Sequence, residues 1–139
     1  MLDLIESAEE ELLFQIPYID SYKPSAKGNL EKLVKALIRK SKQIETVHVI
    51  LRSDHGTWIP CAEDLKKRGL NLDKCFRHLP STHTKGMVVD GKRAYVGSIN
   101  FTTTSMLQNR EVGLIFEKDS EVKKVQDAIV ADFGAGTAL

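Results

Sequence analysis

Side chains that can hold a phosphate group lie close together in one segment of the chain, residues 83–100. His83 offers an imidazole, Lys85 an ammonium, Ser98 a hydroxyl and Asn100 an amide. Residues two apart on an extended segment point to the same side, so His83 and Lys85 share one local site. A phosphate fits between an imidazole and an ammonium, and we therefore expect a phosphoryl group to bind there.

A turn within this segment would bring its two ends together. Residues 90–92 read Asp-Gly-Lys, a typical turn sequence, and residues 93–98 follow as a short strand. If the chain folds back at this turn, Ser98 and Asn100 come close to His83. The separation in sequence then becomes a cluster in space.

The spacing of these residues, HxKx4Dx6GSxN, resembles the signature of the phospholipase D superfamily. Every fixed position is present: His83, Lys85, Asp90, Gly97, Ser98 and Asn100. The order of helices and strands before the motif, and the segment NREVGL after it, are also similar to one half of this family. The resemblance thins at the ends, where no clear strand precedes residue 3. We expect one domain over residues 1–139, either whole or an excised half of a longer protein.

The resemblance implies a two-step reaction that needs no metal ion or other cofactor. His83 would attack phosphorus and form a covalent phosphohistidine, while a second histidine protonates the leaving oxygen and then activates water. Lys85 and Asn100 would hold the phosphoryl oxygens, and Ser98 would add a hydroxyl. Glu111, within NREVGL, would accept a hydrogen bond from the far ring nitrogen of His83 and orient the ring.

The remaining motif residues are expected to be structural. Asp90 would anchor the turn or pair with a nearby basic side chain, and Gly97 is also expected to have a structural role. The chain contains one copy of the motif, whereas the reaction requires two histidines from two motifs. The second histidine would come from a symmetric homodimer, in which two copies of His83 face each other, or from a second half of a longer enzyme.

The other histidines and the tryptophan can be explained by structural roles as well as by functional ones. His48 reads as a strand residue, and His55 and His78 read as residues of a loop or of the site rim. Trp58 lies in an expected loop with His55, where it would line the substrate cleft or anchor the loop. The two cysteines and these histidines show no metal-ligand spacing, so we expect no zinc site.

The pattern of apolar residues predicts an α/β fold, a layered mixed β-sheet flanked by helices. Helices are expected over residues 3–11, from the N-cap candidate Asn29 onward, after Pro60 as far as Gly69, and from about Ser120. Strands are expected over residues 12–19, 46–52, 75–79, 85–90, 93–98 and 111–117.

The charge of the chain is unevenly distributed. The 139 residues sum to a net charge of +1, which excludes a strongly basic nucleic-acid protein. Residues 21–110 nevertheless carry 17 Lys and Arg against 7 Asp and Glu, whereas both ends are acidic. A basic centre suits an anionic substrate such as a phosphodiester, although much of it is equally explained as the solvated face of a helix.

The residues leave three functions open. The first is a metal-independent phosphodiesterase or phosphatidyl transferase of the phospholipase D type, acting on a lipid or its headgroup, with contact to a membrane surface. The second is a nuclease of the same superfamily that cleaves DNA or RNA, and the third is a catalytically silent domain for binding or assembly. The sequence shows neither a secretion signal nor a membrane-spanning run, so a cytoplasmic location is expected.

Overall fold

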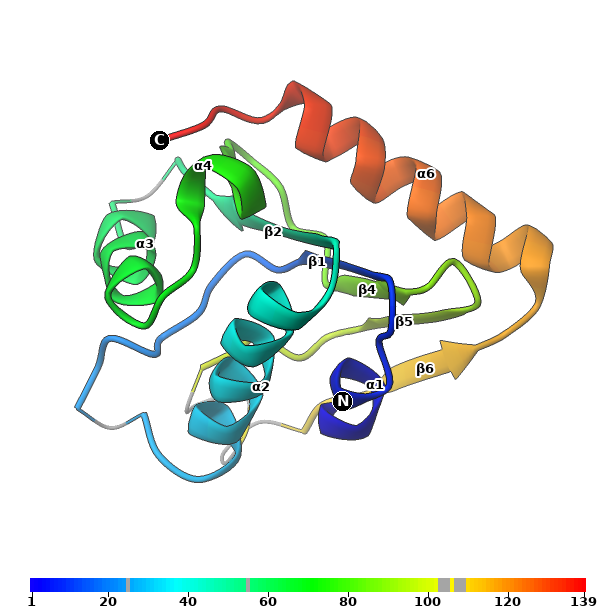
Figure 1. Cartoon of the computed structure of the whole chain (residues 1–139), viewed down its shortest axis with the longest axis horizontal. Coiled ribbons are helices and arrows are strands. Elements are labelled where there is room, and N and C mark those ends of the chain that lie inside the picture. The colour runs from blue at the N-terminus through cyan, green and yellow to red at the C-terminus, as the bar shows by residue number, and fades with distance from the viewer. Residues whose placement is uncertain (25, 55, 103–105, 107–109) are drawn as a thin grey trace.

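A six-stranded mixed sheet forms the centre of the computed structural model, which describes residues 1–24, 26–54, 56–102, 106 and 110–139. The strand order is β3-β2-β1-β4-β5-β6 (Figure 1). The strands are β1 (Glu11–Gln15), β2 (Thr46–Arg52), β3 (Phe76–Leu79), β4 (Gly86–Val89), β5 (Arg93–Gly97) and β6 (Gly113–Phe116). The pairs formed by β1, β2 and β3 are parallel, whereas those that involve β4, β5 and β6 are antiparallel.

Helices cover both faces of this sheet. They are α1 (Leu2–Glu6), α2 (Asn29–Gln43), α3 (Trp58–Lys67), α4 (Leu72–Cys75) and α6 (Asp119–Ala135). Helices α1, α2 and α3 contribute to one hydrophobic cluster, and α6 contributes to a second cluster on the other face. The expected fold class, a layered mixed sheet flanked by helices, is confirmed. None of the helices in the described ranges is long and apolar enough to cross a bilayer.

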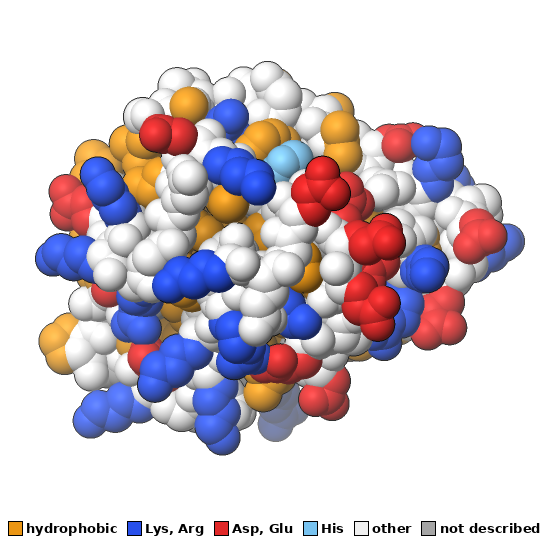
Figure 2. Space-filling view, viewed as in Figure 1, with side chains coloured by type: hydrophobic (Ala, Val, Ile, Leu, Met, Phe, Trp, Pro, Cys, Tyr) orange, Lys and Arg blue, Asp and Glu red, His pale blue; other side chains and the backbone are white. Residues whose placement is uncertain are grey.

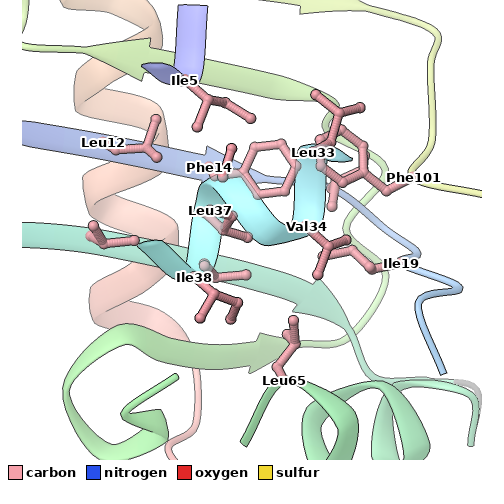
Figure 3. Close-up of a cluster of buried hydrophobic side chains, with 14 of the residues drawn as sticks. Ile5, Leu12, Phe14, Ile19, Leu33, Val34, Leu37, Ile38, Leu65 and Phe101 are labelled. Carbon is pink, nitrogen blue, oxygen red and sulfur yellow. The ribbon is translucent and has the colours of Figure 1, made fainter. Parts of the chain in front are cut away.

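The larger cluster packs α2 against β1 and its neighbours (Figure 3). Helix α2 buries apolar side chains that recur every three or four residues, which is the spacing of one helix face. These are Leu30, Leu33, Val34, Leu37 and Ile38, each at most 7% exposed. They meet Phe14 of β1 and Phe101, whose ring centres lie 4.7 Å apart. This packing holds β1, next to β4, in the middle of the sheet.

The first helix and the first strand are both shorter than expected. Helix α1 ends at Glu6 instead of continuing to residue 11. The N–H groups of residues 9–11 donate to the carboxylate of Asp90, in the turn after β4, instead of to helical carbonyl groups. Strand β1 ends at Gln15, and Pro17 two residues later carries no N–H for a ladder. Beyond it, Ile19 forms an isolated bridge to Phe101.

The boundaries of the two middle helices also differ from expectation. Gly28, with φ of 60°, is the N-cap of α2, and Asn29 is its first residue. Helix α3 begins at Trp58, so Pro60 lies in the first turn, where its missing N–H costs no helical hydrogen bond. Helix α4 was not anticipated from the sequence; the Asn71 side chain caps it by accepting from the Lys74 N–H at 3.2 Å.

Candidate active site

The hairpin of β4 and β5 brings the two ends of the motif together. Its turn has positive φ at Asp90 (54°) and Gly91 (64°), as in a type I′ turn, and the Lys92 N–H donates to the Val89 carbonyl at 3.0 Å. At the other end of the hairpin the Gly97 N–H donates to the Lys85 carbonyl at 3.1 Å. The expected turn is therefore confirmed, and Ser98 follows β5 beside the segment that carries His83.

The side chains of His83 and Lys85 lie next to each other. The Lys85 Nζ is 3.4 Å from the His83 Nδ1 and donates to the His83 carbonyl oxygen at 3.1 Å. The His83 side chain is exposed and that of Lys85 is half-buried. The imidazole and the ammonium therefore form one local group that a ligand in solution can reach.

Ser98 and Glu111 form a second group where β5 meets β6. The Ser98 hydroxyl donates to the Glu111 carboxylate and accepts from the Val112 N–H at 3.0 Å. The Ser98 N–H donates to the Val112 carbonyl at 2.9 Å, which continues the β5–β6 ladder. Glu111 is thus hydrogen-bonded to Ser98, and its expected orienting contact with His83 stays a prediction. Asn100 follows on the same loop and is half-buried.

Asp90 lies at the far end of β4 from His83. Its carboxylate accepts hydrogen bonds from the N–H groups of Glu9, Glu10 and Glu11, at 3.0, 2.8 and 2.9 Å. Partial burial opposes the charged form, but these donors outweigh burial and lower the pKa of Asp90. The motif's aspartate therefore ties the hairpin to the start of β1, at the end of β4 opposite the one that His83 precedes.

Gly97 has no room for a side chain. The ring of Tyr95 lies over Gly97 and over Gly113, its partner on β6. A Cβ at Gly97 would overlap the Tyr95 hydroxyl and lie 2.8 Å from the Gly113 Cα, closer than ordinary contacts. A glycine at this motif position allows an aromatic ring to cover the β5–β6 pair next to Ser98.

Replacing Gly97 with alanine is therefore expected to destabilise the protein by about 1–3 kcal/mol, because the buried Tyr95 ring must move. The matched control is Gly134→Ala in α6, where an added Cβ meets no atom within 4 Å. That control should leave stability unchanged or raise it slightly, since alanine favours the helix. Urea unfolding of both variants measures the difference, and equal stabilities would contradict the steric explanation.

A buried polar network next to His83 was missed in the sequence. Gln15, at the end of β1, is fully buried, and its amide donates to the Thr82 hydroxyl and to the Asp132 carboxylate, each at 2.7 Å. Thr82 immediately precedes His83, so this network holds the backbone that leads into the site. A glutamine inside the apolar run LLFQI was the available signal.

Two of the expected loop or rim residues belong to regular elements, and their place at the rim of the site stays a prediction. His55 lies outside the described residues. Trp58 belongs to α3 and His78 to β3, so neither occupies the expected loop, and their rings stack at 4.1 Å. Trp58 lines a cavity of about 450 Å³ between α3 and α4. A different cavity, of about 480 Å³, is lined by Glu111 together with Ile99 and Lys32.

The described residues contain no group of three or more His, Cys, Asp and Glu side chains that could hold a metal ion. His48 lies in β2, as expected, where its ring stacks on Phe133 at 3.6 Å. Burial lowers its pKa, and Arg77 lowers it further. The two cysteines are free and buried.

The sequence family described as "Cardiolipin synthase, PLD-like domain" matches residues 1–133. The chain belongs to the phospholipase D superfamily. The resemblance inferred from the motif is therefore confirmed. Cardiolipin synthase A of Serratia proteamaculans (strain 568) is 26% identical over 140 residues, which cover 94% of this chain and 27% of that protein. This phospholipase D-like chain thus spans about a quarter of the length of the curated relative.

Solved structures share the phospholipase D-like fold. NUC, a phospholipase D family member from Salmonella typhimurium, has a TM-score of 0.76 at 16% identity, and NucT from Helicobacter pylori has 0.74 at 17%. Each match covers 99% of this chain and 87% of the other. TrmBL2, an archaeal chromatin protein, has a TM-score of 0.61 at 13% identity, covering 99% of this chain and 48% of its own.

Proposed function

We propose that this chain supplies one half of a site that cleaves phosphodiesters without a metal ion, with His83 as the nucleophile. The observation that supports this most directly is the pairing of the exposed His83 imidazole with the Lys85 ammonium, whose Nζ lies 3.4 Å from Nδ1. An accessible imidazole beside a fixed cation can attack phosphorus while the cation attracts the diester. Membership of the phospholipase D superfamily agrees with this reaction class.

In the first step the lone pair of the His83 Nε2 forms a bond to phosphorus, and the bond from phosphorus to the leaving alcohol breaks. A second histidine donates a proton to that alcohol. In the second step this histidine removes a proton from water or from an acceptor alcohol, whose oxygen displaces the imidazole. Lys85 and Asn100 stabilise the charge that builds up on the phosphoryl oxygens in both steps.

Lys85 changes partner during this reaction. A nucleophilic Nε2 requires the ring proton on Nδ1, which cannot then accept from the Lys85 ammonium. A bound diester offers anionic oxygens to Lys85, and we expect its Nζ to turn from Nδ1 towards them. Glu111 then becomes the acceptor for the Nδ1 proton, the role that the family resemblance assigns to it.

The second histidine comes from outside this chain's own motif. The His83 side chain is exposed, so a second imidazole can approach it from another copy of the chain or from a second half of a longer protein. The simplest arrangement is a symmetric homodimer with both copies of His83 on one phosphorus.

The test uses a generic substrate, ³²P-labelled bis(p-nitrophenyl) phosphate. Hydrolysis should proceed in the presence of EDTA, and quenching during turnover should leave label on the protein that acid removes and alkali does not. Loss of activity in EDTA would contradict the metal-independent reaction. Product release without any acid-labile protein label would contradict the phosphohistidine.

A further inference from the structure

The exposed face of α2 is strongly basic. The helix, Asn29–Gln43, contains five Lys and Arg residues and one Glu. Four of the cations follow the spacing of a single stripe, with steps of three, four and three residues: Lys32, Lys35, Arg39 and Lys42. At a rise of 1.5 Å per residue this stripe is about 15 Å long. Figure 2 shows Lys and Arg side chains gathered over the part of this face where α2 lies.

Part of the stripe lines a groove beside the end of α3. The groove has a volume of about 380 Å³, and its lining comprises Lys35, Ile38, Arg39, Lys42 and Arg68. Every charged residue of this lining is a cation. Ile38 is 7% exposed, so most of the apolar surface of the groove comes from the hydrocarbon stems of these Lys and Arg side chains, which carry their charges at their ends.

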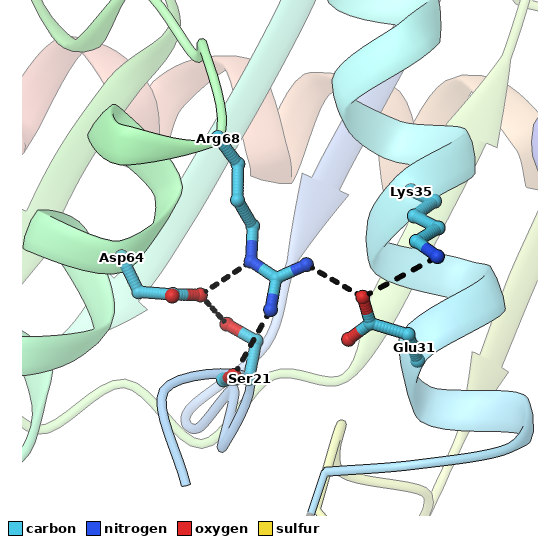
Figure 4. Close-up of polar contacts among 5 residues, drawn as sticks. All are labelled: Ser21, Glu31, Lys35, Asp64 and Arg68. Atoms are coloured by element: carbon cyan, nitrogen blue, oxygen red, sulfur yellow. Dashed lines mark hydrogen bonds and ion pairs between the residues drawn. The ribbon is translucent and has the colours of Figure 1, made fainter. Parts of the chain in front are cut away.

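Two carboxylates, those of Asp64 and Glu31, hold Arg68 in place (Figure 4). The Arg68 guanidinium donates to Asp64 at 2.7 Å, to Glu31 at 2.8 Å and to the Ser21 carbonyl at 3.2 Å. The hydrogen bond to Glu31 is the main cause of the raised pKa of Arg68, which keeps its charge. Glu31 also lies 3.7 Å from the exposed Lys35 Nζ, a separation at which surface pairs contribute little.

Part of the stripe's charge is not neutralised. Arg39 pairs with Glu6, whereas Lys32 and Lys42 form no ion pair with any residue that the structure describes. Lys32 also lines the cavity that contains Glu111 and Ile99. The basic stripe therefore begins beside the proposed site and extends away from it along α2.

The shape of this surface favours a linear polyanion over a membrane. A membrane surface is flat and cannot enter a groove, and helices that lie in a bilayer insert apolar side chains. The large apolar side chains exposed in the described chain lie on or beside α3, β5, β6, α6 and the last residue, and none lies on α2. Proteins that bind single-stranded nucleic acid commonly have a basic groove that runs along the nucleic acid backbone.

We propose that the stripe on α2 binds the phosphate backbone of a nucleic acid strand, and that the substrate is therefore a nucleic acid. The second half of this statement rests on the proposed function, whereas binding by the stripe does not. None of the described groove residues is aromatic, so the contacts are made to phosphates and are independent of sequence.

The experiment measures the affinity for a fluorescent single-stranded dT20 oligonucleotide at several salt concentrations. The test variant is Lys35→Gln/Lys42→Gln, and the matched control is Lys123→Gln/Lys124→Gln on α6, which removes the same charge from side chains that are also exposed. All binding is measured with His83→Asn so that no cleavage occurs. The test variant should bind roughly tenfold more weakly. The negative slope of log affinity against log salt should become less steep by about 1.4, the value for two lost phosphate contacts.

Each outcome decides the proposal. Equal affinities for the test and control variants would overturn it. So would absent oligonucleotide binding with retained binding to phosphatidylglycerol vesicles, which would assign the stripe to a membrane. In the His83-containing protein, Lys35→Gln/Lys42→Gln should hydrolyse bis(p-nitrophenyl) phosphate as fast as wild type, because this small diester does not reach α2. If wild type does not hydrolyse this diester, the proposed function fails, while the binding measurements still test whether the stripe binds a nucleic acid strand.

Discussion

Replacing His83 with asparagine is expected to reduce the rate of diester hydrolysis by a factor on the order of 10⁴ or more. Asparagine offers no lone pair on nitrogen that can attack phosphorus, and in a homodimer the one substitution removes both the nucleophile and the general acid. Because His83 is exposed, the variant should fold as stably as wild type. The measurements are hydrolysis of bis(p-nitrophenyl) phosphate in EDTA and the urea unfolding midpoint.

Mixing distinguishes the two sources of the second histidine. If one site requires His83 from both copies, an equilibrated one-to-one mixture of wild type and His83→Asn contains about a quarter wild-type dimers and should retain about a quarter of the wild-type rate. Half of the rate would indicate that each chain acts alone. An active His83→Asn variant would eliminate this histidine as the nucleophile.

Replacing Asp90 with alanine is expected to destabilise the protein by about 2–4 kcal/mol. The substitution removes the acceptor for the N–H groups of Glu9, Glu10 and Glu11, and it places alanine at a φ of 54°, which a residue other than glycine, asparagine or aspartate disfavours. Urea unfolding at neutral pH measures the loss. Asp90→Asn is the matched control, since it keeps the backbone preference and one acceptor oxygen, and should lose less stability.

The effect of Asp90 should depend on pH. Its pKa is lower in the folded protein than the value of about 3.9 in an unfolded chain. The carboxylate's contribution is therefore fully present above that unfolded value and is lost as the pH falls through the folded pKa. The stability difference between wild type and Asp90→Ala should accordingly narrow in acid. A difference that stays constant down to pH 2 would contradict the hydrogen-bonded carboxylate as its source.

The hairpin and the main helix were accessible from the sequence because their signals are local. An Asp-Gly turn predicts a reversal within four residues, and the spacing of apolar residues in α2 reports which face the helix buries. The order of strands within the sheet has no such signal. It depends on the pairing of β1 with both β2 and β4, which lie far apart in the chain.

The sequence by itself determined the motif, the family and the α/β layering, and it predicted the phosphate chemistry, since these depend on residue types and short spacings. Only the tertiary structure decided that Asp90 bonds to residues 9–11, that Ser98 meets Glu111, and that Gln15 supports Thr82. The three-dimensional arrangement also placed Arg68 beside the basic face of α2. These contacts join residues that lie from 13 to 81 positions apart in the sequence. They stabilise the fold by giving buried or charged groups a hydrogen-bond partner, and the residues next to each group in the sequence do not indicate which distant residue that partner is.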